Sequence, residues 1–182
     1  MLLCKTKNIS KDIADTWCNE VHFTIDEKAK IYRAIGFKNN AGGYELRNEY
    51  YKGSSSPKYI TYVNNKADSI AVFEGFFDFL SYQFIHQNQD GNTTNFLVLN
   101  SLSFFERSLL LMEKHNQIHL YLDNDNAGKK WLDFALNRSK KYIDSSKLYQ
   151  GYKDLNEWHT NFGKLLPKKE NKKSIGRSII KL

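Results

Sequence analysis

Carboxylates stand at the ends of two apolar runs in this sequence. The run at 69–73 is followed by Glu74, and the run at 118–122 is followed by Asp123 and Asp125. Short runs of this kind, with β-branched and aromatic members, predict buried strands. In open α/β sheets ligands bind at the carboxyl ends of strands, where helix amino termini offer unpaired N–H groups. We therefore expect the three acids to lie at a ligand site.

Metal binding is the chemistry that this pattern favours. Asp154 follows a further predicted strand at 147–150, so three of four expected parallel strands end in acids. Carboxylates gathered in a partly buried site repel one another, and a divalent cation is the usual compensation. Oxygen ligands suit Mg²⁺. The pattern predicts a Mg²⁺ site acting on phosphate, with Glu74, Asp123 and Asp125 converging on one ion. Taken singly, the aspartates have a structural alternative as turn or helix-cap residues.

The elements that must position these acids alternate from residue 69 onward. We predict strands at 69–74, 96–100, 118–123 and 147–150, and helices at 76–87, 104–115, 126–141 and 155–162. Continuous apolar strands separated by helices favour a parallel sheet with right-handed crossovers, flanked by helices.

The segment before residue 69 has a different pattern. Residues 8–18 predict a short docking helix capped by Ser10. Residues 20–63 lack helical periodicity and are rich in β-branched and aromatic residues between turns, which predicts an antiparallel meander. We expect its strands at 21–25, 31–37, 43–48 and 59–63. The predicted fold class is α/β, a parallel sheet flanked by helices and preceded by a small antiparallel β-rich subdomain.

The net charge of +7 is concentrated at the carboxyl end, where residues 164–182 contain seven basic residues and one acid. Such a segment is typical of a flexible tail attracted to polyanions, nucleic acid first, and a solvated tail without a specific partner is the alternative. No apolar run approaches the roughly 18 residues of a membrane span, and the first ten residues are too polar for a secretory signal. We expect a cytoplasmic protein without a membrane partner. Cys4 and Cys18 are expected to be reduced thiols, with no structural zinc site.

Three short motifs resemble the toprim (topoisomerase-primase) motifs of bacterial DNA primases in order and spacing. They are EGFFD at 74–78, DND at 123–125 followed by AG at 127–128, and KD at 153–154. Upstream, GGYELRN at 42–48 and SSPKYIT at 55–61 resemble the small β-rich subdomain that precedes toprim in those primases. The segments GGYELRN at 42–48 and FEGFFDFLS at 73–81 are most similar to those of primase-like proteins of mobile elements. The resemblance covers residues 9–163 and implies three parts: an N-terminal helix and β-rich subdomain at 1–66, a toprim domain at 67–163 and a basic tail at 164–182.

The resemblance also implies roles for individual residues. Glu74, Asp123 and Asp125 would be catalytic and would hold Mg²⁺, with Mn²⁺ as an alternative ion, and Asp78 and Asp154 would be further metal ligands. Nucleotide or nucleic-acid phosphates would be contacted by Arg47, Lys58 and Lys129.

The implied function is that of a primase core in DNA replication, a DNA-directed RNA polymerase that makes RNA primers from NTPs on single-stranded DNA. A small toprim nuclease and a non-catalytic nucleic-acid-binding module remain open as alternatives, because the same acids and basic residues would serve each. The resemblance shows neither the zinc-binding module nor the helicase-binding region of such primases, and Asn156 stands where many members carry Asp. We therefore expect either a truncated gene product or a subunit with a separate partner that supplies zinc-binding or helicase functions.

Overall fold

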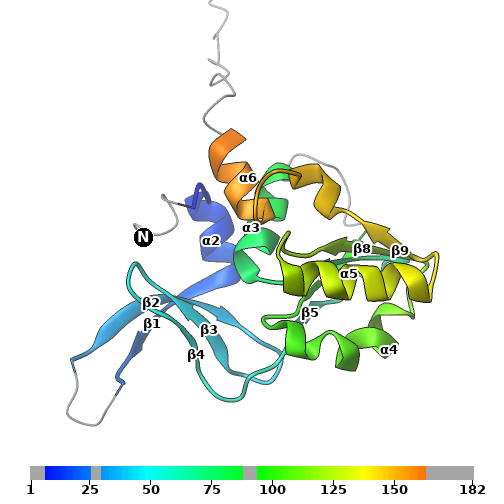
Figure 1. Ribbon diagram of the computed structural model, residues 1–182. Helices are drawn as coiled ribbons and strands as arrows, with labels where there is room; N and C mark the ends of the chain where they lie inside the picture. The colour runs from blue at the N-terminus through cyan, green and yellow to red at the C-terminus, as the bar shows by residue number, and fades with distance from the viewer. Residues whose placement is uncertain (1–6, 26–29, 88–93, 163–182) are drawn as a thin grey trace, which may run out of the picture.

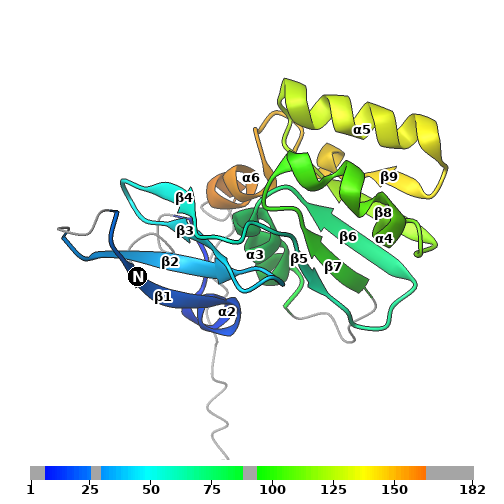
Figure 2. The ribbon, with the colours of Figure 1, turned by 90° about the horizontal axis from the view of Figure 1, so that it is seen from below.

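A computed structural model describes residues 7–25, 30–87 and 94–162 of the chain. Two β-sheets lie on either side of helix α3 (Phe76–Ile85), as Figures 1 and 2 show. The predicted basic tail at 164–182 and Cys4 lie outside the described residues. No helix in the described ranges is long and apolar enough to cross a membrane.

The first sheet, sheet A, is antiparallel with strand order β1-β2-β3-β4. Its strands are β1 (Cys18–Phe23), β2 (Tyr32–Lys38), β3 (Tyr44–Arg47) and β4 (Lys52–Ser54). This confirms the antiparallel β-rich region. Strand β4 was not predicted, because it has only three residues and contains a glycine and serine that are typical of a turn.

The second sheet, sheet B, has the order β5-β7-β6-β8-β9. Its strands are β5 (Thr61–Val63), β6 (Ser69–Phe73), β7 (Thr94–Val98), β8 (Gln117–Tyr121) and β9 (Tyr142–Asp144). Strands β6 to β9 are parallel, and β5 pairs antiparallel with β7. The predicted parallel sheet is confirmed, and β5 adds an antiparallel edge to it.

Two strand predictions were wrong. Residues 59–63 were assigned to the meander, but β5 pairs with β7 of sheet B, a partner that local periodicity cannot reveal. Residues 147–150 were predicted as the fourth parallel strand, which is instead β9, and Ser146–Tyr149 form the 3₁₀ helix η3. The apolar content there reflects Tyr149, whose buried hydroxyl donates to the carbonyl of Leu122 at 2.8 Å.

Helices cover both faces of sheet B (Figure 1). Besides α3, the α-helices of the described residues are α2 (Lys11–Trp17), α4 (Leu109–Met112), α5 (Asn126–Arg138) and α6 (Leu155–Phe162). The predicted helix at 104–115 is instead two 3₁₀ turns, η1 (Leu102–Phe104) and η2 (Glu106–Ser108), followed by the short α4. The predicted cap of the first helix is confirmed, since the Ser10 hydroxyl accepts from the backbone N–H of Ile13.

The core is divided by sheet B, because successive side chains of a strand point to opposite faces. From β6, Phe73 packs with α2 and α3, whereas Val72 packs on the other face with α4 and α5. Phe37 of sheet A joins the first cluster and stacks on Phe76 of α3 with ring centroids 5.2 Å apart. Sheet A is thus fixed to the helix that begins beside Glu74.

Candidate active site

A cleft of about 530 Å³ lies between sheet A and the carboxyl end of sheet B. One wall is the turn that joins β3 to β4, from Arg47 to Lys52. The opposite wall carries four of the predicted site acids: Glu74, Asp78, Asp123 and Asp154. The structure therefore places most of the predicted carboxylates opposite a basic hairpin.

Glu74 and Asp123 meet because their strands are neighbours in register. Glu74 directly follows β6, Asp123 comes two residues after β8, and Phe73 pairs with Tyr121. The backbone N–H of Asp123 donates to Oε2 of Glu74 at 3.4 Å. Burial, and then the charge of Asp123, raise the pKa of Glu74 to about 7. Two carboxylates are thus held close together in a partly buried site, and a bound cation would relieve their electrostatic repulsion.

Lys153 is a site residue that was predicted only as part of the KD motif. Its Nζ lies 3.3 Å from Oδ2 of Asp123, and the charge of Asp123 raises the pKa of Lys153. The side-chain amide of Asn124 donates to the carbonyls of Tyr149 and Tyr152, which ties the loop before Lys153 to the end of β8. A basic residue directly before a site acid was the signal available in the sequence.

Asp78 and Asp154 lie in the same cleft but have structural partners. Asp78 is 7% exposed and accepts the backbone N–H of Asn156 at 3.0 Å. Burial, followed by the charge of Asp154, raises the pKa of Asp78 well above its ordinary value. Asp154 accepts the N–H of Glu157 at 2.7 Å at the start of α6, so the alternative cap contact is present. Asp154 follows η3 and not a parallel strand, which corrects the three-strand pattern.

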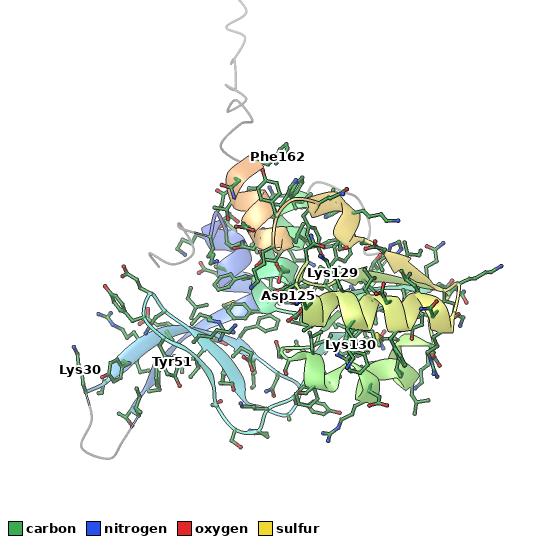
Figure 3. All side chains as sticks on the ribbon, in the orientation of Figure 1. Lys30, Tyr51, Asp125, Lys129, Lys130 and Phe162 are labelled. Atoms are coloured by element: carbon green, nitrogen blue, oxygen red, sulfur yellow. The ribbon has the colours of Figure 1, made fainter. Side chains whose placement is uncertain are left out.

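Asp125 does not join the other acids in this cleft. Its Oδ1 accepts the backbone N–H groups of Ala127 and Gly128 at 3.0 and 2.9 Å, which makes it the N-cap of α5. It is exposed, at the amino end of α5 (Figure 3). Its charge still contributes to the raised pKa of both Glu74 and Asp123. The DND motif therefore supplies one carboxylate to the cleft and one to a helix cap.

Of the three predicted phosphate contacts, Arg47 lies in the cleft. Its guanidinium donates to the carbonyl of Gly53 at 3.1 Å and lies 5.7 Å from the ring centroid of Phe76. Lys58 is exposed and outside the lining of this cleft, and Lys129 lines a neighbouring cleft of about 720 Å³ together with Lys153. Lys52, which was not predicted, lines the main cleft beside Arg47.

Asn100 is a further cleft residue without a predicted role. It follows β7 in the left-handed region at φ +62° and donates through Nδ2 to the carbonyl of Tyr59 at 2.9 Å. Its buried Oδ1 has no hydrogen-bond partner within the described ranges. The only sequence signal was a polar residue at a strand end, which is too common to assign a role.

The arrangement fits a divalent ion held by few protein ligands. Among the residues that the structure describes, no three Asp, Glu, His or Cys side chains could together hold a metal ion. The expected convergence of Glu74, Asp123 and Asp125 on one ion is therefore not seen, because Asp125 caps α5. Mg²⁺ is commonly held by one or two carboxylates, with water and substrate phosphates completing its shell. The Glu74 and Asp123 pair matches that donor set.

Comparisons with known proteins bear on the family and the fold of the chain. Residues 71–159 match the toprim-like family, and residues 3–56 match a domain of unknown function (DUF8464). No curated protein sequence matches the chain.

Two solved structures have a similar fold. One is the primase fragment of the bacteriophage T7 primase-helicase protein, with 19% identity over 88% of this chain and 69% of that chain, and a TM-score of 0.63. The other shows bacteriophage T7 lagging-strand DNA polymerase interacting with primase domains of two gp4 subunits bound to an RNA/DNA hybrid and dTTP. There the match has 17% identity over 87% of this chain and 84% of that chain, and a TM-score of 0.60. Residues 71–159 are therefore toprim-like, and the chain has a fold similar to that of the T7 primase fragment.

Proposed function

We propose that this chain is the toprim-type catalytic core of a DNA primase, which makes short RNA primers on single-stranded DNA with Mg²⁺. The observation that carries the proposal is one cleft with Glu74 and Asp123 on one wall and Arg47 and Lys52 on the other. Carboxylates that attract a metal ion then face cations that attract phosphate. Toprim domains generally bind Mg²⁺, which supports the choice of ion.

The extent of the structural likeness favours a primase over a small nuclease. The match to the T7 primase fragment covers 88% of the chain, whereas the toprim-like match spans only residues 71–159. The likeness therefore extends into sheet A, which supplies the basic wall of the cleft. A nuclease built on the toprim domain alone would not require that wall.

Primer synthesis joins the 3′-hydroxyl oxygen of the growing strand to the α-phosphorus of an NTP and breaks the bond to the β-phosphate, releasing pyrophosphate. Mg²⁺ bound by Glu74 and Asp123, or Mn²⁺ in its place, would lower the pKa of that hydroxyl and stabilise charge on the α-phosphate. Arg47 and Lys52 would hold the triphosphate or the template backbone through charge-assisted hydrogen bonds. Lys153 would keep Asp123 ionised and oriented.

We propose supporting roles for the remaining predicted residues. Asp78 and Asp154 would complete the acidic wall behind Asp123, and Asp125 would join a metal site only by giving up its cap contacts with α5. Lys129 and Lys58 would meet nucleic acid outside the main cleft. We also propose a separate zinc-binding or helicase partner, in keeping with the resemblance to primases.

A paired assay tests the proposed function. One reaction contains unlabelled single-stranded DNA, labelled NTPs and Mg²⁺ or Mn²⁺, and the other contains a labelled strand with metal but no NTPs. We expect template-dependent RNA in the first and an intact strand in the second. Asp123→Asn should abolish synthesis, whereas Asp133→Asn, an exposed aspartate of α5 outside the cleft, should not. A strand shortened without NTPs would establish a nuclease instead, and no metal-dependent reaction in either arm would favour a binding module.

A further inference from the structure

The turn between β3 and β4 holds an exposed tyrosine at the cleft. Tyr50 is 88% exposed, the highest value among the large hydrophobic side chains that the structure describes, and it lines the cleft. The turn itself is fixed. Asn48 accepts the backbone N–H groups of Tyr50 and Tyr51 through Oδ1, at 2.9 and 2.8 Å, and donates through Nδ2 to the carbonyl of Arg33 at 2.9 Å. The exposure of Tyr50 is therefore a property of an ordered turn.

The neighbouring residue Tyr51 packs on an aromatic ring of sheet A, whereas, within the described part of the chain, Tyr50 does not. Tyr51, on sheet A in Figure 3, packs its ring 4.9 Å from Phe23, which in turn lies 5.8 Å from Tyr32. Tyr51 therefore anchors the turn on sheet A. Tyr50 makes no such ring contact with the described residues, so both faces of its ring are available to a ligand.

The charges around Tyr50 select the kind of ligand. Arg47 and Lys52 line the cleft in the same hairpin as Tyr50, against the carboxylate of Glu49. Lys7 also lines the cleft, with its ammonium 5.6 Å from the ring centroid of Phe77 of α3. An aromatic ring beside cations is the combination with which proteins bind single-stranded nucleic acid, because the cations attract phosphates and the ring stacks on a base. In a duplex the base faces are already covered by stacking, so an unpaired strand fits better.

We propose that Tyr50 stacks on an unpaired base of the single strand that enters the cleft, while Arg47 and Lys52 contact its phosphates. This inference rests on the proposed function in one respect, namely that a single strand is the substrate. It adds a base-stacking position on sheet A, on the wall opposite Glu74 and Asp123. Because stacking needs only a flat face, the contact tolerates any template sequence.

Equilibrium binding measured by fluorescence anisotropy tests this assignment without NTPs or metal. The ligands are a short labelled oligothymidine and an abasic strand of the same length, which keeps the phosphates and lacks the bases. Tyr50→Ala should weaken oligothymidine binding by about fivefold or more. It should leave abasic-strand binding and the salt dependence unchanged, because the phosphate contacts remain. Tyr50→Phe should retain wild-type affinity, since the ring is kept.

Tyr59→Ala is the matched control, because Tyr59 is also exposed (45%) but packs on Phe104 outside the lining of the cleft. Its affinity for both strands should equal that of the wild type. Unchanged oligothymidine binding by Tyr50→Ala, or an equal loss on both strands, would overturn the stacking role and leave the proposed function standing. Wild-type protein that binds neither strand would overturn both.

Discussion

Replacing Glu74 with Gln should stabilise the metal-free protein at alkaline pH. Gln keeps the size of the side chain and an acceptor oxygen for the N–H of Asp123, but it removes the charge that faces Asp123. Burial and Asp123 raise the pKa of Glu74 from 4.5 to about 7. The folded state therefore holds a proton that the unfolded state has released, so the free energy of unfolding falls as pH rises from 4.5 to 7 and stays low above it.

The size of this effect follows from the pKa of Glu74. A rise to about 7 corresponds to at most about 3 kcal/mol, and the partial exposure of Glu74 reduces our expectation to about 1 to 2 kcal/mol. For a chain of this length that is an increase in Tm of about 3 to 6 °C.

The assay is thermal unfolding followed by circular dichroism, in EDTA, at pH 5 and pH 8. Glu74→Gln should melt above the wild type at pH 8, and the difference should largely vanish at pH 5, where the wild-type Glu74 is protonated in the folded state. Glu106→Gln, at an exposed position of η2, should match the wild type at both pH values. Two results would show that the charge of Glu74 does not destabilise the folded state: a Glu74→Gln variant that melts below the wild type at pH 8, or one whose Tm differs from that of the wild type by the same amount at both pH values.

Three further predictions concern the metal, the DND loop and the tail. In a thermal-shift titration, Mg²⁺ should raise the Tm of the wild type more than that of Asp123→Asn; equal gains would exclude Asp123 as a ligand. Gly128→Ala should lower the free energy of unfolding by about 1 to 3 kcal/mol in a urea titration, because its Cβ would lie 2.1 Å from the carbonyl oxygen of Asp123; wild-type stability would show that the loop moves freely. Removing residues 164–182, with seven basic residues, should weaken single-stranded DNA binding and flatten its salt dependence; an unchanged slope would leave the tail without that role.

The positions of Glu74 and Asp123 could be predicted from the sequence because β6 and β8 are buried strands. In β6, Val72 and Phe73 are buried on opposite faces, so the strand is a continuous apolar run that ends abruptly at Glu74. The cap of α2 and the bounds of α6 were likewise local signals, since they depend on neighbours within one turn.

The contacts that the sequence could not supply are long-range. Lys153 meets Asp123 across two loops that Asn124 joins, and β5 joins sheet B by pairing with residues more than thirty positions away. Whether Asp125 binds a metal ion or caps α5 depends on the direction of its side chain, which the spacing of the DND motif does not fix. Tyr50 gave no signal because exposure in an ordered turn is a property of the fold.

We propose that Glu74 and Asp123 hold a divalent ion together with nucleotide phosphates. Anomalous diffraction from crystals soaked with Mn²⁺ and an NTP tests it most directly, because Mn²⁺ scatters anomalously and takes oxygen ligands as Mg²⁺ does. We expect an anomalous peak within about 2.0 to 2.3 Å of oxygens of both carboxylates, with the triphosphate between the ion and Arg47. A bound nucleotide with no peak at Glu74 and Asp123, or with the ion held elsewhere, would show that these two carboxylates do not form the metal site.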